Sequence, residues 1–560
     1  MNYEFFLASA LEKVFPGQRP KAMEQGARIS AWRGTKAGVQ LVYFLDGCEV
    51  RAAQTFHIET EGGPSAAVMR SVGLVPSDFP CYENADDEYI TKEPGLFPDL
   101  LESMKAPQVR PLPRQYRSVW LSWDIPEDAR PGDYVITVTA VPDAVNDEAS
   151  GAPVFENQFV LSVGKAELPP QALIHTEWFH TDCLAHYYGV EVFSGEYWRI
   201  VENFIRAAGA EHGINMLLTP VFTPPLDTEV GGERLTVQLV DVVFDGENYS
   251  FGFEKLKRWT ELCRKYGIEY LEIPHLFTQW GAYATPKVIA SVDGGIKRIF
   301  GWDVPATSPA YRKFLEGFLP ALRAELKTLG YDDEHVYYHI SDEPSLKHLE
   351  SYLAAKGQAE DLLEGCQVID ALSNVEFYKQ GIVKQPIPSN NHIQEFYDAK
   401  VPDLWVYYCC GQGYLVPNRF FAMKSARNRI MGVLMYLYRV KGFLQWGYNF
   451  YNSQLSRRPI NPYYMSHADY AFPSGDGYLV YPGEDGTALS SVRAEVQDDA
   501  LLDLRALNLL ESLAGREAVE KVIYENTEIY PMTFTEYPRE EEYLLTLRER
   551  VAEEIEKYMK

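Results

Sequence analysis

The stretch Val336-Tyr-Tyr-His-Ile-Ser-Asp-Glu-Pro344 (VYYHISDEP) decides the fold, because it joins a strand to a helix through an acidic turn. Val336–Ser341 is rich in β-branched and aromatic residues, which is typical of a buried strand, and Pro344 ends it. Ser345–Leu363 follows as a helical pattern. A strand–helix unit of this kind predicts an α/β fold if it recurs along the chain.

The unit does recur on both sides of this stretch. The other predicted strands are Ala172–Phe179, Ile214–Leu218, Ile268–Ile273, Gln367–Leu372, Leu404–Cys409, Ile430–Tyr436 and Gly442–Trp446. The other predicted helices are Gly195–Ala208, Phe253–Tyr266, Pro309–Leu329 and Arg419–Arg429. Eight strands within about 280 residues match the repeat and size of a (β/α)8 TIM barrel. A doubly wound parallel sheet is the alternative fold.

Different patterns flank the predicted barrel. Short strands bounded by turn residues precede it and predict an N-terminal β-sandwich; they are Val39–Leu45, Ser118–Asp124, Tyr134–Val141 and Phe159–Val163. Residues 1–18 have the composition of an amphipathic helix rather than of a signal peptide. The tail has a hairpin signal at Tyr478–Tyr481 and helical patterns at Asp498–Leu513 and Glu540–Tyr558. We therefore predict three domains: residues 1–168 as the sandwich, 169–477 as the catalytic barrel, and 478–560 as a small C-terminal α+β region.

The composition excludes several classes of function. With 79 Asp and Glu against 52 Lys and Arg, the net charge is −27, which disfavours binding to nucleic acid or to an anionic membrane surface. No apolar run is long enough to span a bilayer. The seven cysteines (Cys48, Cys81, Cys183, Cys263, Cys366, Cys409 and Cys410) are scattered, which is typical of free thiols in a reducing compartment. We expect a cytoplasmic protein.

The predicted strand ends are unusually polar and aromatic, as expected for the active face of a barrel. Five of the ten tryptophans lie at or near these ends: Trp178, Trp280, Trp302, Trp405 and Trp446. Flat aromatic faces beside amide and carboxylate groups suit a sugar, which has apolar faces and a rim of hydroxyls. The alternative is that these rings fill the barrel core.

Asp342 and Glu343 are the sharpest candidates for chemistry. Neighbouring residues of a strand point to opposite faces, but at a strand end, where Pro344 turns the chain, both carboxylates can face the barrel mouth. One protonated and one ionised acid is the arrangement that glycoside cleavage needs. The alternative is a helix N-terminus with Ser341 or Asp342 as the cap.

Other chemistries have weaker support. His175, His180 and Asp182 could suggest a metal site, but they lack a metal-binding spacing and strand alternation separates the two histidines. The sequence has no Gly-x-Ser-x-Gly elbow and no phosphate-binding glycine loop. We therefore expect no metal and no nucleotide cofactor.

The run His339–Pro344 resembles the catalytic domain of glycoside hydrolase family 123. Other stretches resemble the same family over residues 170–500: Trp178–Cys183, Phe222–Asp227, Gln445–Phe450, and Tyr481-Pro482-Gly483 with Ser491-Val492-Arg493. Characterised members are β-N-acetylgalactosaminidases that use substrate assistance. The resemblance implies that the 2-acetamido oxygen of the substrate attacks the anomeric carbon, with Asp342 holding the acetamido N–H and Glu343 protonating the leaving oxygen. Retention of configuration and the absence of any cofactor are implied as well.

The remaining site residues are predicted from their positions at strand ends. Tyr407 or Tyr408 could bind the acetamido carbonyl, and Trp446 could form the floor under the sugar ring. The candidates for the hydroxyl rim are His275, Trp280, Asp370 and Asn449.

The expected partner is a glycan that ends in an N-acetylhexosamine. One alternative is a different glycosidase on the same scaffold, with Glu343 as the acid and Asp370 or Glu177 as the nucleophile. Another is a non-catalytic sugar-binding protein. The sequence leaves open the galacto or gluco configuration, the linkage and the oligomeric state.

Overall fold

The computed structural model describes residues 2–47, 53–143 and 152–559, and the chain forms two compact units. Unit 1 contains Met1–Gln171, Pro417–Leu437 and Leu489–Lys560, and unit 2 contains Ala172–Val416 and Tyr438–Ala488. The domain boundaries at residues 168 and 477 stay predictions.

Unit 2 is built on a parallel sheet of eight short strands. In sheet order they are β20 (Gln385–Ile387), β19 (Gln367–Ala371), β18 (Val336–Tyr338), β15 (Tyr270–Glu272), β12 (Met216–Leu218), β11 (Ile174–Glu177), β22 (Gly442–Gln445) and β21 (Trp405–Tyr407). The barrel strand that is last in the chain, β22, pairs with the first, β11, for example at Ile174 and Gly442. A parallel bridge between Ser389 and Tyr407 joins the two remaining edges. The strands thus form a nearly closed barrel of the TIM type.

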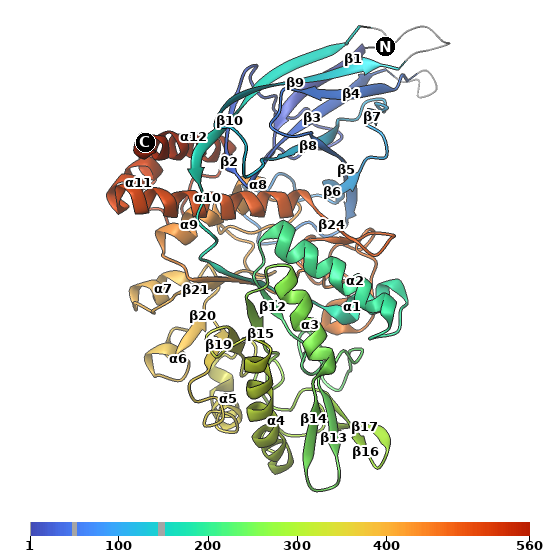
Figure 1. Cartoon of the computed structure of the whole chain (residues 1–560), viewed down its shortest axis with the longest axis vertical. Coiled ribbons are helices and arrows are strands. Elements are labelled where there is room, and N and C mark those ends of the chain that lie inside the picture. Colours follow the sequence, from blue (N-terminus) through green and yellow to red (C-terminus); the bar gives the residue numbers. More distant parts are fainter. Residues whose placement is uncertain (1, 48–52, 144–151, 560) are drawn as a thin grey trace. The chain divides into compact units, whose positions relative to one another are not determined.

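The barrel interior is an apolar core. It includes Met216, Ile369, Ile387, Trp405 and Leu444, which alternate with residues that face outward. Helices follow the strands, coloured from green to yellow in Figure 1: α1 (Thr181–Tyr188), α2 (Gly195–Arg206), α3 (Glu254–Lys265), α4 (Pro309–Thr328), α5 (Leu349–Lys356), α6 (Glu376–Lys379) and α7 (Ile393–Asp398). A four-stranded sheet, β14 (Tyr249–Gly252), β13 (Asp241–Phe244), β16 (Val288–Val292) and β17 (Gly295–Phe300), is inserted among the loops.

The eight strands are not the eight that the sequence predicts. Ile430–Tyr436 was predicted as a strand, but residues of this run form helix α9 (Met431–Leu437), every side chain of which is buried. A continuous apolar run carries no periodicity that separates a buried strand from a buried helix. The missing barrel strand is β20, whose three residues are too few to give a pattern. The predicted helix Ser345–Leu363 is shorter, with α5 preceded by a 3-10 turn at Leu346–His348.

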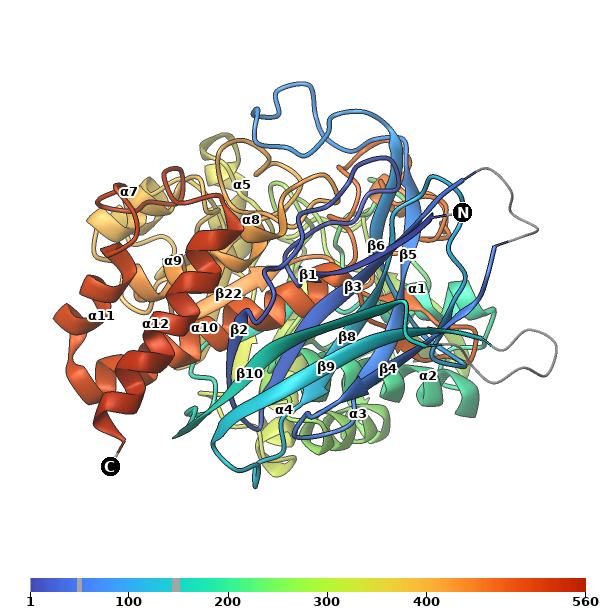
Figure 2. The same ribbon diagram turned by 90° about the horizontal axis from the view of Figure 1, so that it is seen from above.

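Unit 1 contains two five-stranded sheets. One has the order β1 (Asn2–Ser9), β3 (Lys36–Asp46), β8 (Arg117–Asp124), β5 (Val68–Ser77) and β6 (Gly95–Ser103). The other has the order β2 (Arg28–Arg33), β10 (Phe155–Glu167), β9 (Gly132–Pro142), β4 (Phe56–Glu61) and β7 (Gln108–Val109). Figure 2 shows β10, β9 and β4 side by side. Both sheets contribute to one core, for example through Leu41, Leu121, Ile136 and Leu161.

The N-terminal segment is a strand, so the prediction of a helix there is wrong. Asn2–Ser9 pairs antiparallel with β3 along its whole length. Its apolar run suits either element, and the pairing with a distant strand decides between them.

The helices of unit 1 are α8 (Ser425–Arg429), α9, α10 (Val492–Ala514), α11 (Arg516–Tyr524) and α12 (Glu541–Tyr558). The short hairpin of β23 (Tyr481–Pro482) and β24 (Ala488–Leu489) precedes α10. Gly432 of α9 lies so close to α10 that a Cβ there would be 2.0 Å from the Ala500 carbonyl oxygen. Within residues 2–47, 53–143 and 152–559, no helix is both long and apolar enough to cross a membrane. The six cysteines in these ranges form no disulfide bonds with one another, and Cys48 lies outside these ranges.

Candidate functional site

Asp342 and Glu343 occupy the turn that follows β18, at the carboxyl end of the barrel strands. The two residues are fixed from opposite sides: the Trp280 N–H donates to the Asp342 carbonyl oxygen (3.1 Å), and the Glu343 N–H donates to the Ala371 carbonyl oxygen (3.1 Å). Glu343 has φ = 42°, in the left-handed region that a glutamate rarely adopts. Strain of this kind is common at functional sites. The N-cap residue of the following helical turn is Ser345, so neither Ser341 nor Asp342 serves as the cap.

The two carboxyl groups differ in their electrostatic surroundings. Burial raises the pKa of Asp342 well above its ordinary value, and the adjacent charge of Glu343 raises it further. Two close carboxylates resist simultaneous ionisation, so the first proton is held strongly by the pair. A raised pKa on one carboxyl of such a pair suits acid–base chemistry.

Tyr407 completes the contact with Glu343. It ends β21 and points into the barrel, and its hydroxyl donates to Glu343 Oε1 at 2.6 Å. Burial raises the pKa of this phenol well above its ordinary value, and the charge of Glu343 adds to the effect. Tyr408 lies on the other face of the strand, where its ring packs on Phe443 with 5.2 Å between centroids. The structure therefore brings Tyr407 to the acid pair but not Tyr408.

A buried charge network lies below the pair. His339 Nε2 is 2.6 Å from Glu272 Oε1, and His339 Nδ1 is 3.6 Å from Asp370 Oδ1. Burial lowers the pKa of His339, but contacts with these two carboxylates outweigh it and raise the pKa to about 9. Asp370 also accepts hydrogen bonds from the Ile340 N–H (2.9 Å) and the Tyr352 hydroxyl (2.5 Å). The carboxylate of Asp370 thus holds the end of strand β18 in place, and it does not form part of a rim that binds sugar hydroxyls.

His275 lies inside the barrel as well. Its ring stacks on His339 with 4.2 Å between centroids and meets Trp178 edge-on at 5.4 Å. Burial lowers the pKa of His275 well below its ordinary value, and the charge of His339 lowers it further. The neutral ring of His275 therefore packs against an imidazolium.

His275, His339 and Asp370 are also the group of described residues that could hold a metal ion. One ligand atom from each lies within 4.8 Å of the others, and all three residues are buried. Neither ring nitrogen of His275 has a hydrogen-bond partner among the described residues. The near-parallel stacking of the two rings, 26° apart, does not point their nitrogens at one common centre.

Trp280 lies beside the acid pair, and Trp446 directly follows strand β22. Trp280 has φ = 54° and is 40% exposed, directly beside Asp342 through its backbone. Trp446 is half-buried, and its indole N–H donates to Asp476 Oδ2 at 2.9 Å. Both can offer a ring face to a sugar.

Asn449 has a structural role in the geometry. Its Oδ1 accepts from the His180 N–H (2.8 Å), and its Nδ2 donates to the His180 carbonyl oxygen (3.2 Å). The side chain therefore ties the loop after β22 to the end of β11 and is buried.

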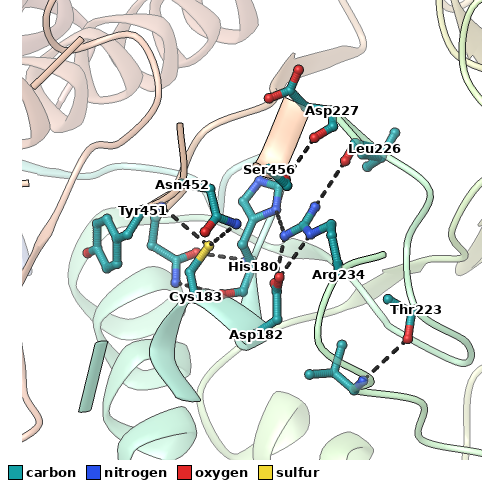
Figure 3. Close-up of polar contacts among 12 residues, drawn as sticks. His180, Asp182, Cys183, Thr223, Leu226, Asp227, Arg234, Tyr451, Asn452 and Ser456 are labelled. Atoms are coloured by element: carbon teal, nitrogen blue, oxygen red, sulfur yellow. Dashed lines mark hydrogen bonds and ion pairs between the residues drawn. The ribbon is translucent and has the colours of Figure 1, made fainter. Parts of the chain in front are cut away.

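Figure 3 shows a buried ion pair that sequence reasoning missed. Arg234, in the long loop after β12, donates to both oxygens of Asp182, from Nε (2.8 Å) and from Nη2 (2.6 Å). It also lies 3.0 Å from His180 Nδ1 and donates to the Leu226 carbonyl oxygen at 3.2 Å. Because guanidinium can only donate, His180 Nδ1 accepts, which leaves the ring proton on Nε2, 2.9 Å from the Trp446 carbonyl oxygen. His180 and Asp182 thus serve a charge cluster, while His175 lies apart from it beside Glu177.

Two further titratable residues, Asp227 and Cys409, interact electrostatically with the pair and were also missed. Asp227 has φ = 37°, and burial raises its pKa to about 6. A hydrogen bond with Cys410 and burial raise the pKa of the Cys409 thiol, and the charges of Glu343 and Asp476 add to this. These residues lie in irregular segments without periodicity, and only the polar Thr-Pro-Pro-Leu-Asp segment after a strand could have signalled Asp227.

Comparisons with known proteins concern the family and the fold of the chain. The model of the family "Glycoside hydrolase 123, catalytic domain" matches residues 178–510. The chain is similar in structure to a family 123 glycoside hydrolase from Clostridium perfringens, with a TM-score of 0.73 and 14% identity over 100% of this chain and 98% of that one. A β-glucuronidase from Bifidobacterium dentium aligns with a TM-score of 0.31 and 9% identity over 89% of this chain and 67% of that one. No curated protein matches. Since the family model covers more than half of the chain, the protein belongs to glycoside hydrolase family 123 and is a glycoside hydrolase.

Proposed function

We propose that the protein is a retaining exo-hydrolase that removes terminal β-linked N-acetylgalactosamine, with the 2-acetamido group of the substrate as the nucleophile. The observation that carries the proposal is the adjacent pair Asp342–Glu343 in one strained turn at a barrel strand end. Retaining enzymes that supply their own nucleophile need two carboxyls about 5 Å apart across the sugar ring. Adjacent acids suit a reaction in which the enzyme supplies none. The galacto preference follows from the family resemblance alone.

In this mechanism Asp342 holds the acetamido N–H and stabilises the oxazolinium ion that forms when the acetamido oxygen attacks the anomeric carbon. The raised pKa of Asp342 gives it the shared proton in the free enzyme. Binding of the acetamido N–H favours the ionised form of Asp342, since a hydrogen bond to a carboxylate lowers its pKa. The proton then moves to Glu343, where the reaction needs it.

Glu343 is the general acid in the first step and the general base in the second. The Tyr407 hydroxyl fixes Oε1, which leaves Oε2 for the leaving oxygen and later for the incoming water. Water attacks the oxazolinium from the face that the aglycone left, so the configuration is retained. Trp446 and Trp280 supply ring faces for the sugar.

The alternative glycosidase mechanism has less support. Asp370 would have to act as a nucleophile while it accepts hydrogen bonds from Ile340 and Tyr352 and pairs with His339. Glu177 is fully buried in β11. Neither carboxylate faces a sugar in the way that a nucleophile must.

The test is a panel of 4-nitrophenyl β-glycosides: N-acetylgalactosaminide, N-acetylglucosaminide and galactoside. We expect the wild type to cleave the N-acetylgalactosaminide fastest and the galactoside not at all. Glu343→Gln and Asp342→Asn should each lower kcat by about 10²–10⁴-fold, the usual effect of removing an acid–base group. A thiazoline analogue of the oxazolinium should inhibit competitively.

Glu350→Gln is the matched control, because Glu350 is an exposed carboxylate in the first turn of α5. It should retain wild-type rates. Hydrolysis of no N-acetylhexosaminide by the wild type would rule the proposal out, and cleavage of the plain galactoside at a similar rate would favour an enzymic nucleophile.

A further inference from the structure

The circular order of the strands divides the mouth of the barrel into two sides. The backbone of Asp342 accepts a hydrogen bond from Trp280, in the loop after β15. The backbone of Glu343 donates one to Ala371 of β19, and its side chain accepts one from Tyr407 of β21. Strand β12 lies next to β15, on the side away from β19. The loop after β12 therefore belongs to the Asp342 side of the site.

Asp227 lies in that loop, and a chain of contacts links it to Asp342. Gln279 Nε2 donates to the carbonyl oxygen of Thr228 (2.9 Å), the residue after Asp227. The next residue along, Trp280, donates its N–H to the Asp342 carbonyl oxygen. The charge of Asp227 is also close enough to raise the pKa of Asp342.

The backbone holds Asp227 in a defined, strained conformation. Its φ of 37° is matched by positive φ angles at Leu455 (59°) and Ser456 (51°) in the loop that contacts it. The Leu455 N–H donates to Asp227 Oδ2 at 2.9 Å, and the Ser456 hydroxyl donates to the Asp227 carbonyl oxygen at 2.7 Å. Two strained loops that fix each other in this way suggest a precise placement of the side chain.

One oxygen of this carboxylate is left for a ligand. Oδ1 makes no hydrogen bond within the part of the chain that the structure describes, while Oδ2 is anchored. Figure 3 shows the carboxylate pointing away from the guanidinium of Arg234, which bonds instead to Asp182 and to the Leu226 carbonyl oxygen. Asp227 is half-buried, so part of the residue lies at the surface of the protein.

We propose that Asp227 is a specificity residue that accepts a hydrogen bond from the 3-hydroxyl of the terminal N-acetylhexosamine. The assignment rests on the proposed function, in which Asp342 binds the group at C2 and Glu343 acts at C1. C3 lies on the side of C2 that is away from C1, and Asp227 lies on the side of Asp342 that is away from Glu343. An anchored carboxylate at that place accepts from an O–H and discriminates against sugars that lack it or carry a substituent there.

The test combines Asp227→Asn with substrates that lack one hydroxyl. Asparagine is the replacement because it tolerates the left-handed backbone and still offers an oxygen to the Leu455 N–H. For the parent 4-nitrophenyl N-acetylhexosaminide, kcat/KM should fall about 10- to 100-fold, the value of a hydrogen bond to a charged group. On the 3-deoxy substrate the variant and the wild type should differ less than about threefold, because the partner hydroxyl is absent.

Two controls make the outcome specific. Glu229→Gln removes an exposed carboxylate of the same loop and should leave all rates unchanged. The 4-deoxy substrate should show the full loss in Asp227→Asn. Equal losses for the parent and 3-deoxy substrates, or coupling to the 4-hydroxyl alone, would overturn the assignment. If the wild type cleaves no N-acetylhexosaminide, the proposed function itself fails. If the wild type cleaves the parent substrate but Asp227→Asn loses equally on the parent and 3-deoxy substrates, only the assignment of Asp227 fails.

Discussion

Replacing Asp182 by Asn should loosen the long loop that follows β12. The side chains of Asp182 and Arg234 are 3% and 2% exposed, and two hydrogen bonds join them. The variant keeps the shape of the side chain but leaves the guanidinium buried without its counter-charge. The loop should therefore open more often, because the closed state of the variant buries an uncompensated charge on Arg234.

The magnitude follows from the burial of the pair. Removing one partner of a buried ion pair costs about 3–5 kcal/mol, since the remaining charge is uncompensated. His180 Nδ1 and the Leu226 carbonyl oxygen still accept from Arg234, so we expect a value near the lower end, about 3 kcal/mol. A change of this size multiplies the open population of the loop about 150-fold.

Hydrogen exchange measured by mass spectrometry can detect this opening. Four amides are bonded across the loop and its neighbours: Glu229 to Leu455, Val237 to Thr223, Leu239 to Pro220 and Val240 to Val221. Peptides that contain these amides should exchange about 100-fold faster in Asp182→Asn at neutral pH. Peptides from unit 1 should exchange as in the wild type.

Two comparisons decide whether the reasoning is right. Arg457→Gln breaks an exposed pair with Glu229 that is about half exposed on each side, and it should change exchange by less than about fivefold. The double variant Asp182→Leu/Arg234→Met should recover part of the protection, because no unpaired charge is left. Unchanged exchange in Asp182→Asn, or additive effects in the double variant, would refute the argument.

Three further predictions concern stability. The pKa of buried His339 is raised from an unfolded value near 6.5 to about 9, so its stabilisation is complete below pH 6.5 and is lost as the pH rises through 9. The free energy of unfolding, measured by denaturant titration, should fall over this range by up to about 3 kcal/mol, and His339→Gln should reduce this pH dependence. His180, whose pKa is lowered to about 3, should act in the opposite direction and remove stability as the pH falls below 6.5, which His180→Gln should prevent. Gly442→Ala would place a Cβ 2.2 Å from the packed ring of Trp405 and should lower the melting temperature by an amount equivalent to about 1–3 kcal/mol, whereas Gly195→Ala, which meets open space, should not. An unchanged melting temperature for Gly442→Ala would contradict the tight packing of β22 on β21.

The strand–helix repeat and its catalytic edge were readable from the sequence where local patterns are strong. Val336–Tyr338 and Gly442–Gln445 are strands as predicted, and the rule that active sites lie at strand ends led to Asp342 and Glu343. The pattern failed at α9 and β20. Met431–Leu437 is buried all round and therefore aperiodic, and Gln385–Ile387 is a strand only because its neighbours in the barrel pair with it.

The site was harder to predict from the sequence than the fold, because its residues come from loops, which have no hydrophobic periodicity. Tyr407 and Tyr408 are equivalent in sequence, and only the direction of β21 separates the one that meets Glu343 from the one that packs on Phe443. Asp370 follows a strand as a rim residue should, yet its carboxylate is used by His339 and by backbone N–H groups.

The sequence by itself determined the kind of molecule: a repeating α/β chain with an acid pair after one strand and the motifs of a glycoside hydrolase family. These features follow from local composition and spacing. Only the tertiary structure decided which acid of the pair has the raised pKa, which tyrosine reaches Glu343, and which loop holds Asp227 in its strained conformation. Protonation and contact depend on burial and on neighbours that lie far apart in the chain, and no local pattern specifies either.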